Sequence, residues 1–83
     1  MYKELKALLT EYENSVLVQN DIIAINRTRL CGAVAARNRA EEKRLRTLLS
    51  VLYDEKRDLL QTIEELKEYC DDNNSDFVAE ESA

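Results

Sequence analysis

The 83-residue sequence contains no histidine, no proline, no tryptophan and only one glycine. The absence of histidine removes the commonest general base and the commonest nitrogen ligand for metal ions. A histidine-activated serine or cysteine nucleophile is therefore excluded within this chain. The scarcity of proline and glycine removes the residues that most often interrupt helices. We expect a helical protein that is not an enzyme, uses no metal or cofactor and binds no small-molecule substrate, because helix bundles of this size seldom enclose a pocket.

Features typical of secreted and membrane proteins are also missing. The two cysteines, Cys31 and Cys70, have neither the spacing of metal ligands nor the number expected of a disulfide framework. No apolar run approaches the roughly 18 residues that cross a bilayer. Residues 1–4 lack the basic and then apolar plan of a signal peptide. We expect a soluble, cytoplasmic protein with no membrane partner.

Two heptad stripes of mostly apolar residues run along the chain. Alternating steps of three and four residues place each stripe on one side of a helix, as in a coiled-coil seam. The first stripe consists of Leu5, Leu9, Tyr12, Val16, Gln19, Ile23, Asn26 and Leu30. The second consists of Leu45, Leu49, Leu52, Lys56, Leu59, Ile63, Leu66 and Cys70. Because the second stripe is out of step with the first, one straight coiled coil does not fit. The sequence predicts an all-α fold, an antiparallel two-helix coiled-coil hairpin.

The single glycine, Gly32, marks the predicted turn, since glycine adopts the left-handed C-cap conformation without strain. Folding the stripes together just beyond it places Ile23 opposite Leu45, and Gln19 opposite Leu49. The predicted elements are a helix over about residues 2–31, a turn over about 32–36 and a helix over about 37–72, which together form one domain.

Two other arrangements remain open. In a long bent helix, Gly32 would lie inside the helix at a cost of about 1 kcal/mol relative to alanine. A break at Asn20–Asp21 would instead give three shorter helices.

Apolar residues also lie outside the seam, and residues 16–25 are apolar on nearly all sides. A helix that is apolar on more than one face is buried by more than one neighbour. Dimerisation of hairpins into a four-helix bundle would bury this surface, and so would a helix from another protein. The residues predicted to form a protein interface are Val18, Ile22, Ile25, Leu48, Val51 and Leu60.

The seam itself contains three polar residues, Gln19, Asn26 and Lys56. They have two interpretations. They mark the frayed or wet ends of the bundle, or they fix register and partner number at a cost in stability.

Charge is distributed unevenly along the chain, although the net charge is −5. Residues 27–46 carry seven basic and two acidic side chains, whereas residues 47–83 carry three basic and eleven acidic ones. In a hairpin, the basic side chains gather at the turn end. The residues predicted to bind an anion or an acidic partner are Arg29, Arg37, Arg39, Lys43, Arg44 and Arg46.

Three interpretations of this basic block stay open: a solvated helix face with intrahelical pairs such as Glu42 with Arg46, a site for an acidic protein surface, or a nucleic-acid site. The acidic net charge and the absence of aromatic residues from the block argue against nucleic acid.

Residues 73–83 are acidic and have few apolar side chains, so we predict a disordered acidic tail. Its one apolar pair, Phe77–Val78, is a candidate docking motif.

Taken together, these patterns predict a helical protein–protein interaction module: a small regulator, inhibitor or assembly chaperone that forms a homodimer and binds a target protein through its helix faces. The alternative is a nucleic-acid-binding regulator that uses the basic block at the turn end of a four-helix bundle.

Overall fold

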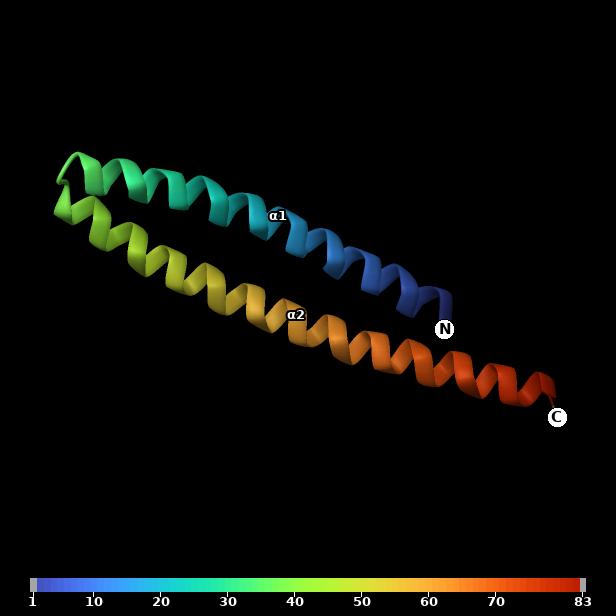
Figure 1. Cartoon of the computed structure of the whole chain (residues 1–83). Coiled ribbons are helices and arrows are strands. Elements are labelled where there is room, and N and C mark those ends of the chain that lie inside the picture. Colours follow the sequence, from blue (N-terminus) through green and yellow to red (C-terminus); the bar gives the residue numbers. More distant parts are fainter. Residues whose placement is uncertain (1, 83) are drawn as a thin grey trace.

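The computed structural model describes the backbone of residues 2–82 and the side chains of residues 2–70. It consists of two helices, α1 (Tyr2–Ala35) and α2 (Arg39–Ser82). The helices run antiparallel and pack against each other along the length of α1, joined by a tight turn (Figure 1). The predicted all-α helical hairpin is therefore confirmed. The backbone of α2 continues as a helix to Ser82, beyond the predicted helix end near residue 72. The side chains of this segment, including Phe77–Val78, lie outside the described residues, so the docking motif stays a prediction.

The turn lies further along the chain than the predicted 32–36, because α1 continues through Gly32 to Ala35. Arg37, with a positive φ of 56°, is the left-handed residue that ends the helix. The Arg37 N–H donates to the Val34 carbonyl (3.1 Å) and the Asn38 N–H to the Ala33 carbonyl (2.9 Å). This pair of hydrogen bonds is the Schellman motif, which satisfies carbonyls at a helix C-terminus.

Asn38 also begins the second helix. Its backbone carbonyl accepts the Glu42 N–H (2.9 Å), and its side-chain Oδ1 accepts the Glu41 N–H (3.3 Å). Asparagine is among the preferred N-cap residues for this reason. Asn38 thus belongs both to the C-terminal motif of α1 and to the N-cap of α2, which keeps the connection short.

The later turn shifts the pairing of the two stripes by about one heptad. Gln19, predicted opposite Leu49, instead donates from Nε2 to the Leu52 carbonyl (3.1 Å) and to Oε2 of Glu55 (3.0 Å). Ile23, predicted opposite Leu45, belongs to a buried cluster with Leu49 and Leu52. The predicted seam residues are correct, but the predicted pairs are wrong.

The observed register has a simple physical advantage. Lengthening the hairpin brings the last stripe residues of α2 alongside the start of α1, so Leu5 shares a groove with Leu66, and Cys70 is buried. Near the turn, Ala33 is also buried. Burial of each additional apolar side chain contributes to stability in proportion to its area.

Two polar side chains are buried in the seam, Gln19 and Asn26, at 9% and 7% exposure. Asn26 donates to the Ile22 carbonyl of its own helix (2.8 Å), so only Gln19 connects the two helices through hydrogen bonds. Both lie in the middle of the hairpin, between buried leucines and isoleucines. The interpretation of these two as residues of a wet or frayed end is therefore wrong.

Two substitutions distinguish the observed turn at Arg37 from the predicted turn at Gly32. Each should raise stability if the turn lies at Arg37 and lower it if the turn lies at Gly32. Gly32→Ala should raise the free energy of unfolding by about 1 kcal/mol, because Gly32 is inside a helix and a Cβ there meets no atom within 4 Å. Arg37→Gly should raise it by about 0.5–1 kcal/mol, because glycine adopts a positive φ without strain. Urea denaturation monitored by circular dichroism measures both. A loss of stability in Gly32→Ala would restore the glycine-centred turn.

Replacing Gln19 tests what its hydrogen bonds contribute. Because the Leu52 carbonyl lies inside a helix, Gln19→Leu leaves no buried backbone group without a partner. We expect the free energy of unfolding to rise by about 1 kcal/mol, since a buried amide is exchanged for an apolar side chain. Gln61→Leu, at an exposed position on α2, is the matched control and should change stability by less than about 0.5 kcal/mol. A loss of stability in Gln19→Leu would show that its hydrogen bonds outweigh its desolvation.

Candidate interaction surfaces

Exposed apolar side chains lie on both flanks of the seam. On α1, Val18, Ile22 and Ile25 follow each other at steps of four and three residues, so they share one side of the helix. Their exposed fractions are 58%, 38% and 53%. On α2, Leu48 and Val51 are likewise three residues apart; Val51 is 48% exposed and Leu48 is half-buried against the core cluster.

Charged neighbours show that these two groups lie on the same face of the hairpin. Glu41 is one heptad before Leu48, and Arg29 is one heptad after Ile22. The pKa of the Glu41 carboxyl is lowered mainly by the hydrogen bond from Arg44, and the Arg29 guanidinium of the opposite helix contributes to the same shift. The contacts between the helices agree with this. Leu48 packs against the cluster that contains Ile23. Gln19 of α1 reaches Glu55, one heptad after Leu48. The two rows therefore share one flank of the seam. We call Val18, Ile22, Ile25, Leu48 and Val51 the isoleucine face.

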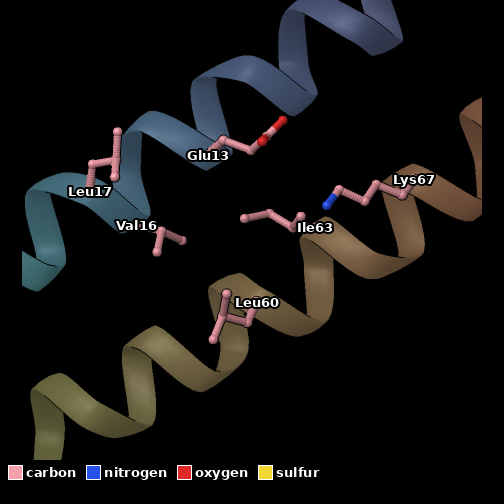
Figure 2. Close-up of a pocket in the computed structure, with 6 residues that line it drawn as sticks. All are labelled: Glu13, Val16, Leu17, Leu60, Ile63 and Lys67. Atoms are coloured by element: carbon pink, nitrogen blue, oxygen red, sulfur yellow. The ribbon is translucent and has the colours of Figure 1, made fainter.

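The opposite flank carries a second apolar group. Leu17 and Leu60 line a hollow between the two helices together with Val16 and Ile63 (Figure 2). Tyr53 is one heptad before Leu60 and lies in the same row of α2. Leu17, Tyr53 and Leu60 are 63%, 43% and 44% exposed. We call these three residues the hollow face.

The hollow is bounded at one end by opposite charges. Glu13 from α1 and Lys67 from α2 extend toward each other across it (Figure 2). The row of α2 that contains Tyr53 and Leu60 begins with Arg46 and ends with Lys67, each one heptad apart. The apolar part of the hollow face is thus flanked by basic side chains.

Five of the six predicted interface residues lie on the isoleucine face, and Leu60 lies on the hollow face. The interface prediction omitted Leu17 and Tyr53, which accompany Leu60. Both are apolar positions outside the stripes, so their exposure follows from the heptad pattern. Their grouping with Leu60 depends on the register, which is known only once the turn is placed.

All six predicted anion-binding residues are exposed and lie in or near the turn end of the hairpin. Two of them pair within α2: Arg44 Nε donates to Glu41 (3.0 Å), and Arg46 Nη2 forms an ion pair with Glu42 (2.9 Å). The predicted Glu42–Arg46 pair is therefore confirmed. Within the described side chains, no ion pair involves Arg29, Arg37, Arg39 or Lys43.

Charge is also polarised along the isoleucine face. Arg29 and Arg44 lie beside the patch on the side of the turn, together with one acidic residue, Glu41, which pairs with Arg44. On the other side, rows of the same face continue with acidic residues at heptad spacing: Glu11 precedes Val18, and Asp58 follows Val51. The acidic residues of this half are Glu11, Glu55, Asp58 and Glu65.

Residues suited to metal chemistry do not come together. Among the described residues there is no cluster of three or more histidine, cysteine or acidic side chains that could hold a metal ion. Cys31 is exposed, Cys70 is buried, and both are free thiols. Over the same part of the chain, neither helix is apolar enough to cross a membrane.

Comparison with known proteins adds no family assignment. No protein-family model, curated protein or solved structure matches this chain.

Proposed function

We propose that the chain is a non-enzymatic protein–protein interaction module, a small regulator, inhibitor or assembly chaperone that binds a target protein through its helix faces. The observation that supports this proposal most directly is the amount of apolar surface left outside the seam. Among the described side chains, seven hydrophobic residues are buried, whereas eleven large hydrophobic residues are exposed. The two-helix seam therefore leaves many large apolar side chains exposed.

Covering these residues would contribute substantially to an assembly. Each large apolar side chain removed from water is worth about 1.5–3 kcal/mol. A domain of this size has a small core and often gains stability from association. Because the isoleucine face and the hollow face lie on opposite flanks, a single helix cannot cover both.

The hollow face suits a helix of the target protein. Its apolar residues form a strip between α1 and α2, the arrangement in which an amphipathic helix lays its apolar side. Arg46 and Lys67 flank that strip, and Glu13 lines it beside Lys67. Two basic side chains thus stand against one acidic one, so an acidic helix would be favoured over a basic one. The target would therefore present an amphipathic helix with acidic residues beside its apolar stripe.

The test compares capture of proteins from the native host by the wild-type chain and by single variants. Leu17→Asp and Leu60→Asp place a charge on the hollow face and should each reduce recovery of the target at least about 30-fold, the effect of losing a central interface residue. Gln61→Asp adds the same charge next to Leu60 at an exposed position and should retain the target. If no protein is recovered specifically, or if all three variants behave alike, the proposed function is wrong.

The basic block supports the alternative, a nucleic-acid-binding regulator. Arg37, Arg39 and Arg44 lie together at the start of α2 and in the turn, where arginine can contact phosphates in bidentate fashion. If this alternative holds, the triple Arg→Glu variant should abolish binding to generic RNA and DNA, and wild-type affinity should fall steeply with salt. Absence of wild-type binding at about 50 mM salt would eliminate it.

A further inference from the structure

We infer that a second copy of this chain covers the isoleucine face, packed antiparallel about a two-fold axis, so that two hairpins form a four-helix bundle. This inference deepens the proposed function, because it assigns one apolar face to self-association and leaves the hollow face for the target. Three properties of the isoleucine face support it: its apolar centre, its charge polarity and its area.

The apolar residues of the face are concentrated at its centre. Ile22 and Ile25 of α1 lie beside Leu48 and Val51 of α2. Beyond the residues of the face, no large apolar residue occupies the next heptad position of these rows, and the exposed Leu8 and Tyr69 lie further out, toward the open end. A two-fold axis through this group, perpendicular to the hairpin, brings the patch onto an identical patch. Such an isologous contact is the commonest form of association between identical chains.

Charge selects the antiparallel orientation. The two-fold axis reverses the second hairpin, so its turn side overlies the open side of the first. Arg29 and Arg44 of one copy then lie over the half that carries Asp58 and Glu11 in the other. A parallel arrangement, with the two-fold axis along the hairpin, would place Arg29 of one copy near Arg44 of the partner subunit. Opposite charges across an interface favour the first arrangement, and like charges penalise the second.

The overlap is large enough for a stable dimer. With the axis near Ile22 and Ile25, about 28 residues of each helix lie opposite the second copy, which corresponds to about 42 Å at 1.5 Å per residue. Two helices side by side are about 20 Å wide, because each has a diameter of about 10 Å. The resulting footprint of about 840 Å² per chain matches the roughly 800 Å² per partner of a standard interface.

The first experiment is sedimentation equilibrium of the purified chain. We expect a dimer at tens of micromolar. Ile25→Asp should weaken the dimer at least about 30-fold, because a charge is placed in the apolar centre. Leu17→Asp is the matched control: it is on the same helix, at a similarly exposed residue, but on the opposite flank, and should leave the dimer intact. A monomeric wild-type chain, or dissociation by Leu17→Asp and not by Ile25→Asp, overturns the inference.

The second experiment tests orientation by a charge swap. Arg44→Asp and Asp58→Arg, which lie one heptad to either side of Val51 and face each other across the two-fold axis, should each weaken the dimer about 3- to 10-fold at low salt, because each substitution acts at two symmetry-related positions. The double variant should recover most of the loss, because the pair re-forms between chains with its charges exchanged. Arg46→Asp, an equal charge change near Arg44 but on the other flank, is the control and should have little effect. The antiparallel orientation is contradicted if the double variant raises the dimer dissociation constant by a factor equal to, or larger than, the product of the factors for the two single variants.

These experiments separate the inference from the proposed function. Self-association is measured on the purified chain without any target, and the substitutions at Ile25, Arg44 and Asp58 leave the hollow face unchanged. If the chain is monomeric but still binds its target through Leu17 and Leu60, the inference fails and the proposed function stands. If the chain dimerises through the isoleucine face but no target is recovered, the inference stands and the proposed function fails.

Discussion

The position of the turn between α1 and α2 determines every contact along the seam. Arg37 in the left-handed conformation and Asn38 as the shared cap fix where the chain reverses. In an antiparallel pair of heptad stripes, moving the turn changes which residues face each other all the way to the open end. The pairing of Gln19 with Glu55 and the burial of Cys70 follow from it. The grouping of exposed residues into two faces follows as well.

The sequence was sufficient to predict the all-α hairpin and the residues of its seam. Heptad stripes identify the buried side of each helix, but they leave the pairing uncertain by whole heptads, because a shift of seven residues matches the stripes equally well. The turn signal must resolve that uncertainty, and Gly32 suggested the wrong position. Asn38 followed by Glu41 was a valid N-terminal signal for α2. This signal pointed to a later turn than Gly32 did. The preference of glycine for helix C-termini is only statistical, and it does not depend on how the two helices pack.

The candidate surfaces were predictable in part for the same reason. Exposure of Val18, Ile25 and Leu17 follows from their positions outside the stripes. Which of them share a face with residues of α2 depends on which flank of the second helix lies beside them. The electrostatic effect of Arg29 on Glu41 and the hydrogen bond from Gln19 to Glu55 provide that information for one flank. The hollow shared by Leu17 and Leu60 provides it for the other.

The two faces of the hairpin differ in composition and therefore suit different partners. The isoleucine face has an apolar centre, a basic end and an acidic end, so its basic end lies opposite the acidic end of an antiparallel second copy. The hollow face has an apolar strip with flanking basic side chains. Gln19 lies between them in the seam, and its hydrogen bond to Glu55 connects the interior to the acidic half of the isoleucine face. A change of register would alter this arrangement and the composition of both faces.

The register is therefore the claim on which the account depends, and nuclear Overhauser effects between methyl groups measure it directly. The account predicts cross-peaks from the Ile23 methyls to those of Leu49 and Leu52, and none to those of Leu45. Strong cross-peaks between Ile23 and Leu45 would place the turn at Gly32 and contradict the account.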